Sequence, residues 1–144
     1  MADETNDGKP FAAGSCSCGN ISLVIREKPQ LMLQCHCLDC QKSTGTGHTS
    51  NAYFATEDVT IHGDAACHSV ESETGYEMIR CFCPTCGARM YGYNGQKPGT
   101  ISIPVGCLDD HSWFSPQVVL YASHREDWDI TSDEVPTFDK MPPA

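Results

Sequence analysis

The chain has 144 residues, which is enough for one domain with a substantial core. Its hydrophobic content of 40% and charged content of 19% are typical of a globular protein and exclude a disordered one. The formal net charge is −10, and the nine Lys and Arg residues are scattered, so we expect neither nucleic acid nor a membrane as a partner.

The N-terminal segment is acidic and polar and shows no basic and apolar pattern of a signal peptide. No apolar run approaches the ~18 residues that a membrane span needs. We therefore expect a cytoplasmic protein with a disordered arm over residues 1–12 and a single domain over residues 13–142. Cysteines in a reducing compartment favour metal or redox chemistry, and disulfides remain the alternative.

The predicted elements are mostly short strands, because β-branched and alternating segments recur along the chain. A helical turn is expected over residues 38–43, ended by Gly45 and Gly47. A hairpin is expected to turn at residues 72–75. Pro104 favours an edge or a bulge for its strand. The strands are predicted at residues 20–27, 31–34, 50–54, 59–62, 67–70, 76–82, 88–93, 100–105 and 118–121.

Seven of the ten cysteines lie in three tight clusters. Two of the clusters are short knuckles followed by Gly19 and Gly87, which permit the positive φ that turns backbone amides toward sulfur. Two such knuckles together make the closed four-thiolate set of a structural zinc. A redox dithiol is the alternative reading of Cys-x-x-Cys. The predicted ligands of the structural zinc are Cys16, Cys18, Cys83 and Cys86.

The middle cluster supplies three thiolates, Cys35, Cys37 and Cys40, within six residues. Three protein ligands and one open position are typical of a catalytic zinc, which can hold a small thiol as a thiolate. Iron or copper(I) also accepts thiolate ligands. A second closed zinc is the alternative, completed by His36, Cys67, Cys81 or Cys107.

The remaining candidates have plainer expected roles. The side chain of His36 is expected to point away from the metal, because ligands flank it on both sides. Cys67, Cys81 and Cys107 are interpreted as buried core thiols. Lys42 is a candidate to neutralise the site or to meet an anionic substrate.

Three stretches in order resemble the glutathione-dependent formaldehyde-activating enzyme family, also called the GFA or centromere-protein-V-type domain. They are residues 14–19, 35–45 and 80–87, and residues 105–110 and 128–138 resemble later segments. The resemblance implies a mainly β fold of zinc-bound folded sheets, of the Mss4-like or β-tent type. It also implies two zinc ions per chain, a structural one on Cys16, Cys18, Cys83 and Cys86 and a catalytic one on Cys35, Cys37 and Cys40.

The leading functional hypothesis is a zinc-dependent carbon–sulfur lyase that acts on an adduct of glutathione or another small thiol. The family's founding activity implies formation of S-hydroxymethylglutathione from formaldehyde. A non-catalytic, zinc-stabilised binding module is the alternative, and a redox sensor is a third. No general base is identifiable from the sequence.

Overall fold

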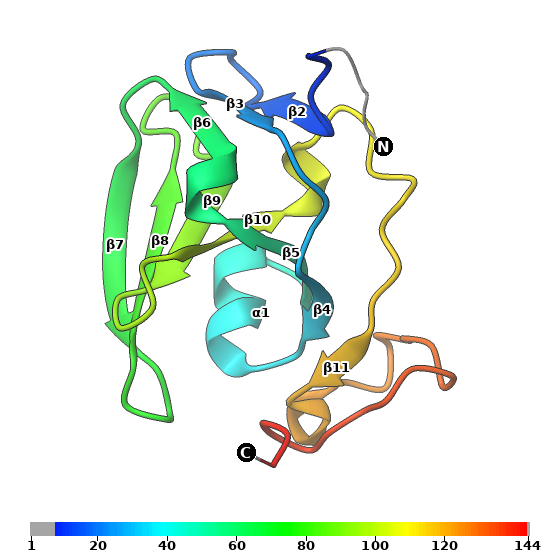
Figure 1. Ribbon diagram of the computed structural model, residues 1–144. Coiled ribbons are helices and arrows are strands. Elements are labelled where there is room, and N and C mark those ends of the chain that lie inside the picture. Colours follow the sequence, from blue (N-terminus) through cyan, green and yellow to red (C-terminus); the bar gives the residue numbers. More distant parts are fainter. Residues whose placement is uncertain (1–7, 144) are drawn as a thin grey trace.

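The computed structural model describes residues 8–143, which form a mainly β protein with two sheets and one short helix (Figure 1). The seven-stranded sheet has the order β11-β4-β5-β10-β9-β8-β7, and the three-stranded sheet has the order β2-β3-β6. The strands are β2 (Ala12–Ser15), β3 (Ser22–Ile25), β4 (Leu31–Cys35), β5 (Thr49–Ala55), β6 (Val59–His62), β7 (Ala66–Glu71), β8 (Glu77–Phe82), β9 (Arg89–Asn94), β10 (Thr100–Pro104) and β11 (Val118–Leu120). The mainly β fold class predicted from the sequence is confirmed.

The helical segments are short and connect strands. The single α-helix, α1 (Leu38–Thr44), ends at Gly45, whose φ of 77° is the left-handed value that a helix C-cap favours. The helical turn expected there is therefore confirmed. Three 3-10 turns complete the set among residues 8–143: Thr56–Asp58, Val105–Cys107 and Ala122–His124. None of the described helices has the length and apolar character needed to cross a membrane.

The N-terminal strand β2 is the element that the sequence did not predict. Residues 1–7 of the expected arm lie outside the described residues. Ala12 begins β2, one residue before the expected start of the domain, and the amide of Phe11 already donates to the carbonyl of Ile25. Small residues such as those of Ala12–Ser15 have weak strand propensity, so pairing with β3 supplies the stabilisation.

Two sequence-based expectations about strands and cysteines are wrong. Cys67 and Cys81 are not free core thiols but form a disulfide between β7 and β8. They face one another in the register of this predicted hairpin, which brings their Cα atoms to 4.1 Å. Pro104 does not mark an edge strand, because β10 lies between β5 and β9. It is the last residue of β10, where the pairing with β9 has ended, although it still pairs with Asn51 on β5.

The main core lies between the two sheets, where alternate residues of β3 meet the inner face of the larger sheet. Leu23 and Ile25 are 0% exposed, as are Phe54 and Ile103 from the middle of the seven-stranded sheet. A second, smaller cluster surrounds the end of β4 and contains Leu33, Cys35, Leu120 and Tyr121. One end of β4 is therefore packed well enough to hold a cysteine side chain in place.

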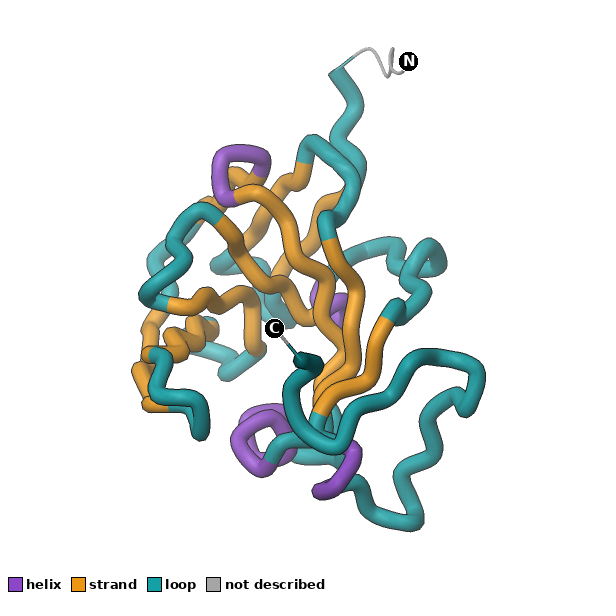
Figure 2. Tube along the Cα trace, turned by 60° about the horizontal axis from the view of Figure 1, so that its bottom comes forward, coloured by secondary structure: helices purple, strands orange, loops and turns teal. Residues whose placement is uncertain are grey.

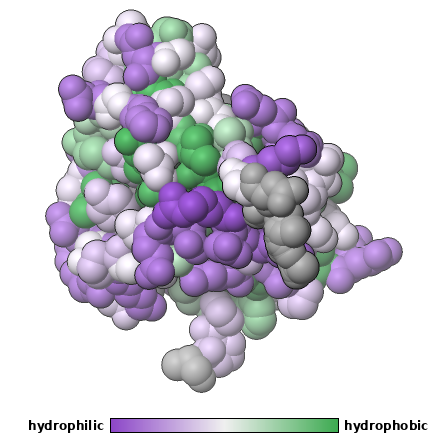
Figure 3. Space-filling view, turned by 45° about the horizontal axis from the view of Figure 1, so that its top comes forward, coloured by the Kyte–Doolittle hydropathy of each residue, from purple (hydrophilic) through white to green (hydrophobic). Residues whose placement is uncertain are grey.

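The C-terminal segment folds back along the larger sheet (Figure 2). Strand β11 pairs in parallel with β4, and Phe138 then bonds Val119 on the other side of β11. The register places Leu120 directly beside Cys35. The face shown in Figure 3 carries mostly hydrophilic side chains, as the acidic composition leads one to expect.

Candidate metal centres

The two predicted knuckles adopt closely similar local structures. The amide of Gly19 donates to the carbonyl of Cys16, and the amide of Gly87 donates to the carbonyl of Cys83. Both glycines have positive φ, 82° and 81°, which confirms the local geometry expected from their position after each knuckle. Such tight turns bring the two cysteines of each knuckle to one side of the chain.

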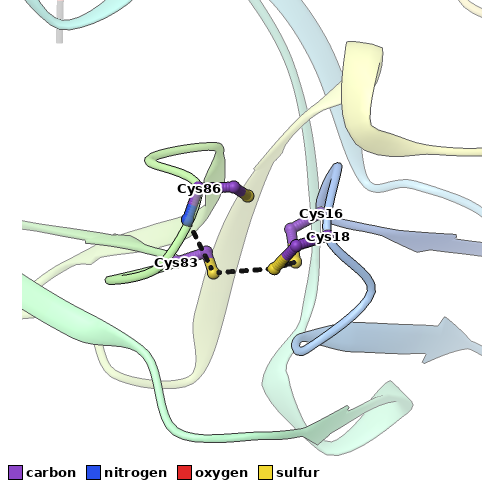
Figure 4. A group of neighbouring side chains, drawn as sticks. All are labelled: Cys16, Cys18, Cys83 and Cys86. Atoms are coloured by element: carbon purple, nitrogen blue, oxygen red, sulfur yellow. Dashed lines mark hydrogen bonds between the residues drawn. The ribbon is translucent and has the colours of Figure 1, made fainter.

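The four knuckle cysteines converge between the two sheets (Figure 4). The sulfur of Cys18 lies 3.6 Å from those of both Cys16 and Cys83. A tetrahedron of sulfurs at zinc–sulfur distances of ~2.3 Å has edges of about 3.8 Å. The four ligand atoms lie within 4.8 Å of one another, so they can hold a metal ion. The first knuckle joins β2 to β3 and the second joins β8 to β9, so this centre links the two sheets.

Backbone amides in the knuckles point at sulfur, as thiolates require. The amide of Ile21 donates to the sulfur of Cys16 at 3.2 Å, and the amide of Cys86 donates to that of Cys83 at 3.5 Å. A hydrogen bond from the backbone of Ala88 is the main cause that lowers the pKa of Cys86 to about 6. Burial, together with the neighbouring thiols, raises the pKa of Cys18 to about 11, so the four sulfurs of this centre differ in how readily they lose a proton.

The second cluster is built by the junction of β4 and α1. Cys35 is the last residue of β4, Cys37 is the N-cap of α1, and Cys40 lies within its first turn. The sulfur of Cys37 accepts a hydrogen bond from the amide of Cys40 at 3.2 Å. Helix capping by a cysteine thus turns its sulfur toward that of Cys40, and the three sulfurs can hold a metal ion together.

Close packing of the three sulfurs makes their protonation interdependent. Hydrogen bonds from Cys35, and then from Cys40, hold the pKa of Cys37 well below its ordinary value. The hydrogen bonds that Cys35 makes with the side chains of Cys37 and then Cys40 raise the pKa of Cys35. Thiolate sulfurs are ligands that suit a soft cation.

None of the four residues considered as a fourth ligand joins this triplet among residues 8–143. Cys67 and Cys81 are consumed by their disulfide. The sulfur of Cys107 contacts the carbonyl of Met90 at 3.8 Å. The ring of His36 is directed elsewhere, as described below.

His36 belongs to a second polar cluster beneath the triplet, with His48 and Asp129. Its Nδ1 lies 3.1 Å from the carbonyl oxygen of Gly47 and 3.2 Å from Oδ2 of Asp129. The Nδ1 of His48 lies 2.7 Å from the same carboxylate oxygen. A Cβ on Gly47 would meet that carboxylate at 2.2 Å, so only glycine allows the approach. Asp129 therefore ties the C-terminal segment to the residue between two triplet cysteines.

Gln41 makes a second connection between the triplet and the C-terminal segment. Its Nε2 donates to the carbonyl of His36 at 2.9 Å and to the carbonyl of His124 at 3.0 Å. The amide of His36 also donates to the carbonyl of Leu120. The backbone that carries Cys35 and Cys37 is consequently fixed on several sides.

Two arginines and a tyrosine approach the triplet from the sheet, and sequence reasoning assigned none of them a role. Arg89 donates from Nη1 to the hydroxyl of Thr49 at 3.2 Å, and Thr49 pairs directly with Cys35 across β4 and β5. Arg80 acts electrostatically on the thiols of Cys37 and Cys40. Burial, followed by the charge of Cys40, raises the pKa of Tyr53. Both arginines flank the second knuckle in sequence, which was the available signal.

Lys42, the basic residue that the sequence did single out, lies on the other side of α1. It lines a shallow hollow of about 340 Å³ with Leu38 and Trp128. A different hollow of about 390 Å³ lies between the knuckle centre and α1, and Arg89, Thr44 and Cys107 line it.

The family model for "Glutathione-dependent formaldehyde-activating enzyme" matches residues 11–124. The chain belongs to this family. The match spans both knuckles and the triplet, and the predicted recognition is thereby confirmed. Residues beyond 124, which include Asp129, lie outside it.

Among solved structures, the chain is similar to a crystal structure of a Rhodobacter sphaeroides protein. The two share 18% identity with a TM-score of 0.53 over 69% of this chain and 90% of that one. At this identity the likeness concerns the fold alone, and it agrees with the sheet architecture described above. No protein of curated function matches the chain.

Proposed function

We propose that the protein is a zinc-dependent carbon–sulfur lyase that acts on an adduct of glutathione or another small thiol. Formation of S-hydroxymethylglutathione from formaldehyde is the leading reaction, because the family is described by that activity. The observation that carries the proposal is the triplet itself: three convergent sulfurs without a fourth ligand from residues 8–143. A closed structural centre would have four.

The donor sets support two zinc ions per chain. Cys16, Cys18, Cys83 and Cys86 would hold a structural ion, and Cys35, Cys37 and Cys40 would hold a catalytic one. Zinc in the triplet would supply a positive charge that lowers the pKa of an incoming thiol and keeps its sulfur nucleophilic. The protein's part is to hold the three cysteines rigidly through β4, α1 and the hydrogen bonds of His36 and Gln41.

The reaction forms one carbon–sulfur bond and opens one carbonyl. The thiolate attacks the carbon of formaldehyde, the π electrons move to oxygen, and that oxygen takes up a proton. Tyr53 is our candidate to donate a hydrogen bond to this oxygen, because its raised pKa keeps the hydroxyl protonated near the triplet.

The test is metal analysis followed by a thiol titration. We expect purified protein to contain about two zinc ions per chain. In cobalt-substituted protein, glutathione should change the visible absorption of one cobalt ion, and Cys40→Ser should abolish the change. An unaltered cobalt spectrum at saturating glutathione would contradict the proposal.

Tyr53→Phe separates the hydrogen bond to the developing oxygen from thiol binding. The variant should bind glutathione as before and lose about 10²-fold in the rate of adduct formation, as an oxyanion donor does. Tyr91→Phe, on β9, is the control and should retain the rate. Equal rates in the two variants would remove Tyr53 from the mechanism.

A further inference from the structure

The floor beside the triplet is a polar ladder on one face of the larger sheet. Cys35 on β4 pairs with Thr49 on β5, and the Thr49 hydroxyl donates to the side chain of Asn51 at 2.7 Å. Asn51 in turn donates to the hydroxyl of Ser102 on β10 at 3.2 Å. The Arg89 guanidinium joins this ladder at Thr49, directly opposite a triplet cysteine.

The charges on this face do not balance within the protein. Among residues 8–143, no carboxylate lies within ion-pair distance of Arg80 or Arg89. Arg80 also donates no side-chain hydrogen bond there. Burial, and then the charge of Arg80, lower the pKa of Arg89. Two unpaired arginines in a chain of net charge −10 need a specific reason.

Geometry, rather than the charge count, points to a further ligand group at Arg89. Three thiolates around one divalent ion would carry a net charge of −1, and a bound substrate thiolate would make it −2, which already matches the +2 of Arg80 and Arg89. Arg89, however, has no carboxylate partner among residues 8–143 and lines a hollow in which a polar group of a ligand can reach it. The hollow that Arg89 lines supplies the room, about 390 Å³, which lies within the ~300–1,000 Å³ range of small-molecule sites. Hydroxyls of Ser15, Ser43 and Thr44 line the same hollow.

We propose that Arg89, assisted by Arg80, is a recognition site for a carboxylate of the thiol substrate. The inference rests on the proposed function, because it supposes that a thiol enters the triplet. It assigns the substrate class as thiols that carry a carboxylate, and it disfavours neutral and cationic thiols. The planar guanidinium of Arg89 suits a carboxylate because it can offer two parallel N–H donors.

The test uses a matched pair of probes, mercaptoacetate and 2-mercaptoethanol, which differ in carboxylate against hydroxyl. Cobalt absorption of the substituted protein reports binding of the sulfur. The Nε–H resonance of Arg89 in ¹⁵N-labelled zinc protein, assigned through its loss in Arg89→Gln, reports binding of the carboxylate. We expect wild-type protein to prefer mercaptoacetate and both signals to respond to it.

Arg89→Gln should weaken the binding of mercaptoacetate by roughly 10- to 100-fold, which is the effect of a charge-assisted hydrogen bond. The affinity for 2-mercaptoethanol should stay within about twofold of the wild-type value. Arg80→Gln should have the smaller effect of the same kind. Arg26→Gln is the control, because it removes the same charge at a site where Arg26 contacts Thr60 and Glu57. It should change neither affinity.

Each failure has its own signature. If Arg89→Gln weakens both thiols equally, the arginines only balance the cysteine charge and the inference is wrong. A cobalt response without an Arg89 response also overturns the inference while the proposed function stands. An Arg89 response without a cobalt response leaves Arg89 as an anion site, but it refutes the proposed function and with it the assignment of the anion to a thiol substrate. Silence of both signals rejects both.

Discussion

The two cysteine centres hold sulfurs at similar separations but differ in how far the chain must travel to build them. The knuckle centre joins Cys18 to Cys83, which are 65 residues apart, and it links the two sheets. The triplet draws its sulfurs from the junction of one strand and one helix. A metal that closes a long loop contributes to folding, whereas a local cluster can change its occupancy with little effect on the fold.

The two centres also differ in the groups that surround their sulfurs. Cys18 and Cys86 are exposed, and the bonds to the knuckle sulfurs come mainly from nearby backbone amides. The triplet is instead approached by the side chains of Arg80, Arg89 and Tyr53. Side chains that gather around a cluster without being needed to build it are the sign of a site that meets a ligand.

Breaking the long-range centre should have the largest effect on stability. Cys83→Ser removes a fully buried cysteine of the knuckle centre, which we propose as a metal ligand, so we expect a loss of more than about 4 kcal/mol in the free energy of unfolding. Chemical denaturation with metal analysis measures it. A variant that keeps wild-type stability without its knuckle metal would show that the two centres do not differ as described.

Loosening the support beneath the triplet should have an intermediate effect. Asp129→Asn removes the charge that accepts from His48 and lies beside His36, which should cost about 1–3 kcal/mol. We also expect the metal of the triplet to bind about tenfold more weakly, measured by competition with a chelator.

The exposed Asp127, two residues away, provides the matched control as Asp127→Asn. It removes the same charge from the same segment and should leave both quantities unchanged. If Asp127→Asn and Asp129→Asn behave alike, the effect is one of general charge and the link from Asp129 to the triplet is wrong.

Breaking the local centre should have the smallest effect on folding. Cys40→Ser should release one metal per chain and change the free energy of unfolding by less than about 1 kcal/mol, because α1 and β4 remain packed. Metal content and denaturation midpoints, compared with those of Cys83→Ser, complete the test. A large loss of stability would favour the non-catalytic binding module.

The sequence predicted what depends on short-range spacing. The knuckles were predictable because cysteines one or two residues apart, followed by Gly19 or Gly87, have few ways to face one another. The same is true of the capped helix that starts after Cys37. Strand β2 was missed because Ala12–Ser15 form a strand only through a neighbour that supplies the pairing.

Contacts between distant segments were the part that the sequence could not supply. The pair of Asp129 with His48 spans 81 residues, and no local pattern marks it. The Cys67–Cys81 disulfide is an intermediate case, because the predicted hairpin turn at residues 72–75 places these two residues opposite one another. It was not predicted because disulfides are rare in a reducing compartment, which is where the protein was expected to lie. A role for Arg80 and Arg89 at the triplet could not be predicted from the sequence, because it depends on how β8 and β9 pack.

That disulfide has a consequence for how the protein is handled. Strand β7 is an edge strand of the larger sheet. Backbone amides of an edge strand exchange with solvent early, and its unpaired N–H and C=O groups can pair with a strand of another molecule. The Cys67–Cys81 disulfide cross-links β7 to β8. After a reductant breaks this disulfide, no covalent bond holds β7 to its neighbour. Samples prepared with dithiothreitol and samples prepared in air will therefore differ in hydrogen exchange along β7 and in their tendency to self-associate.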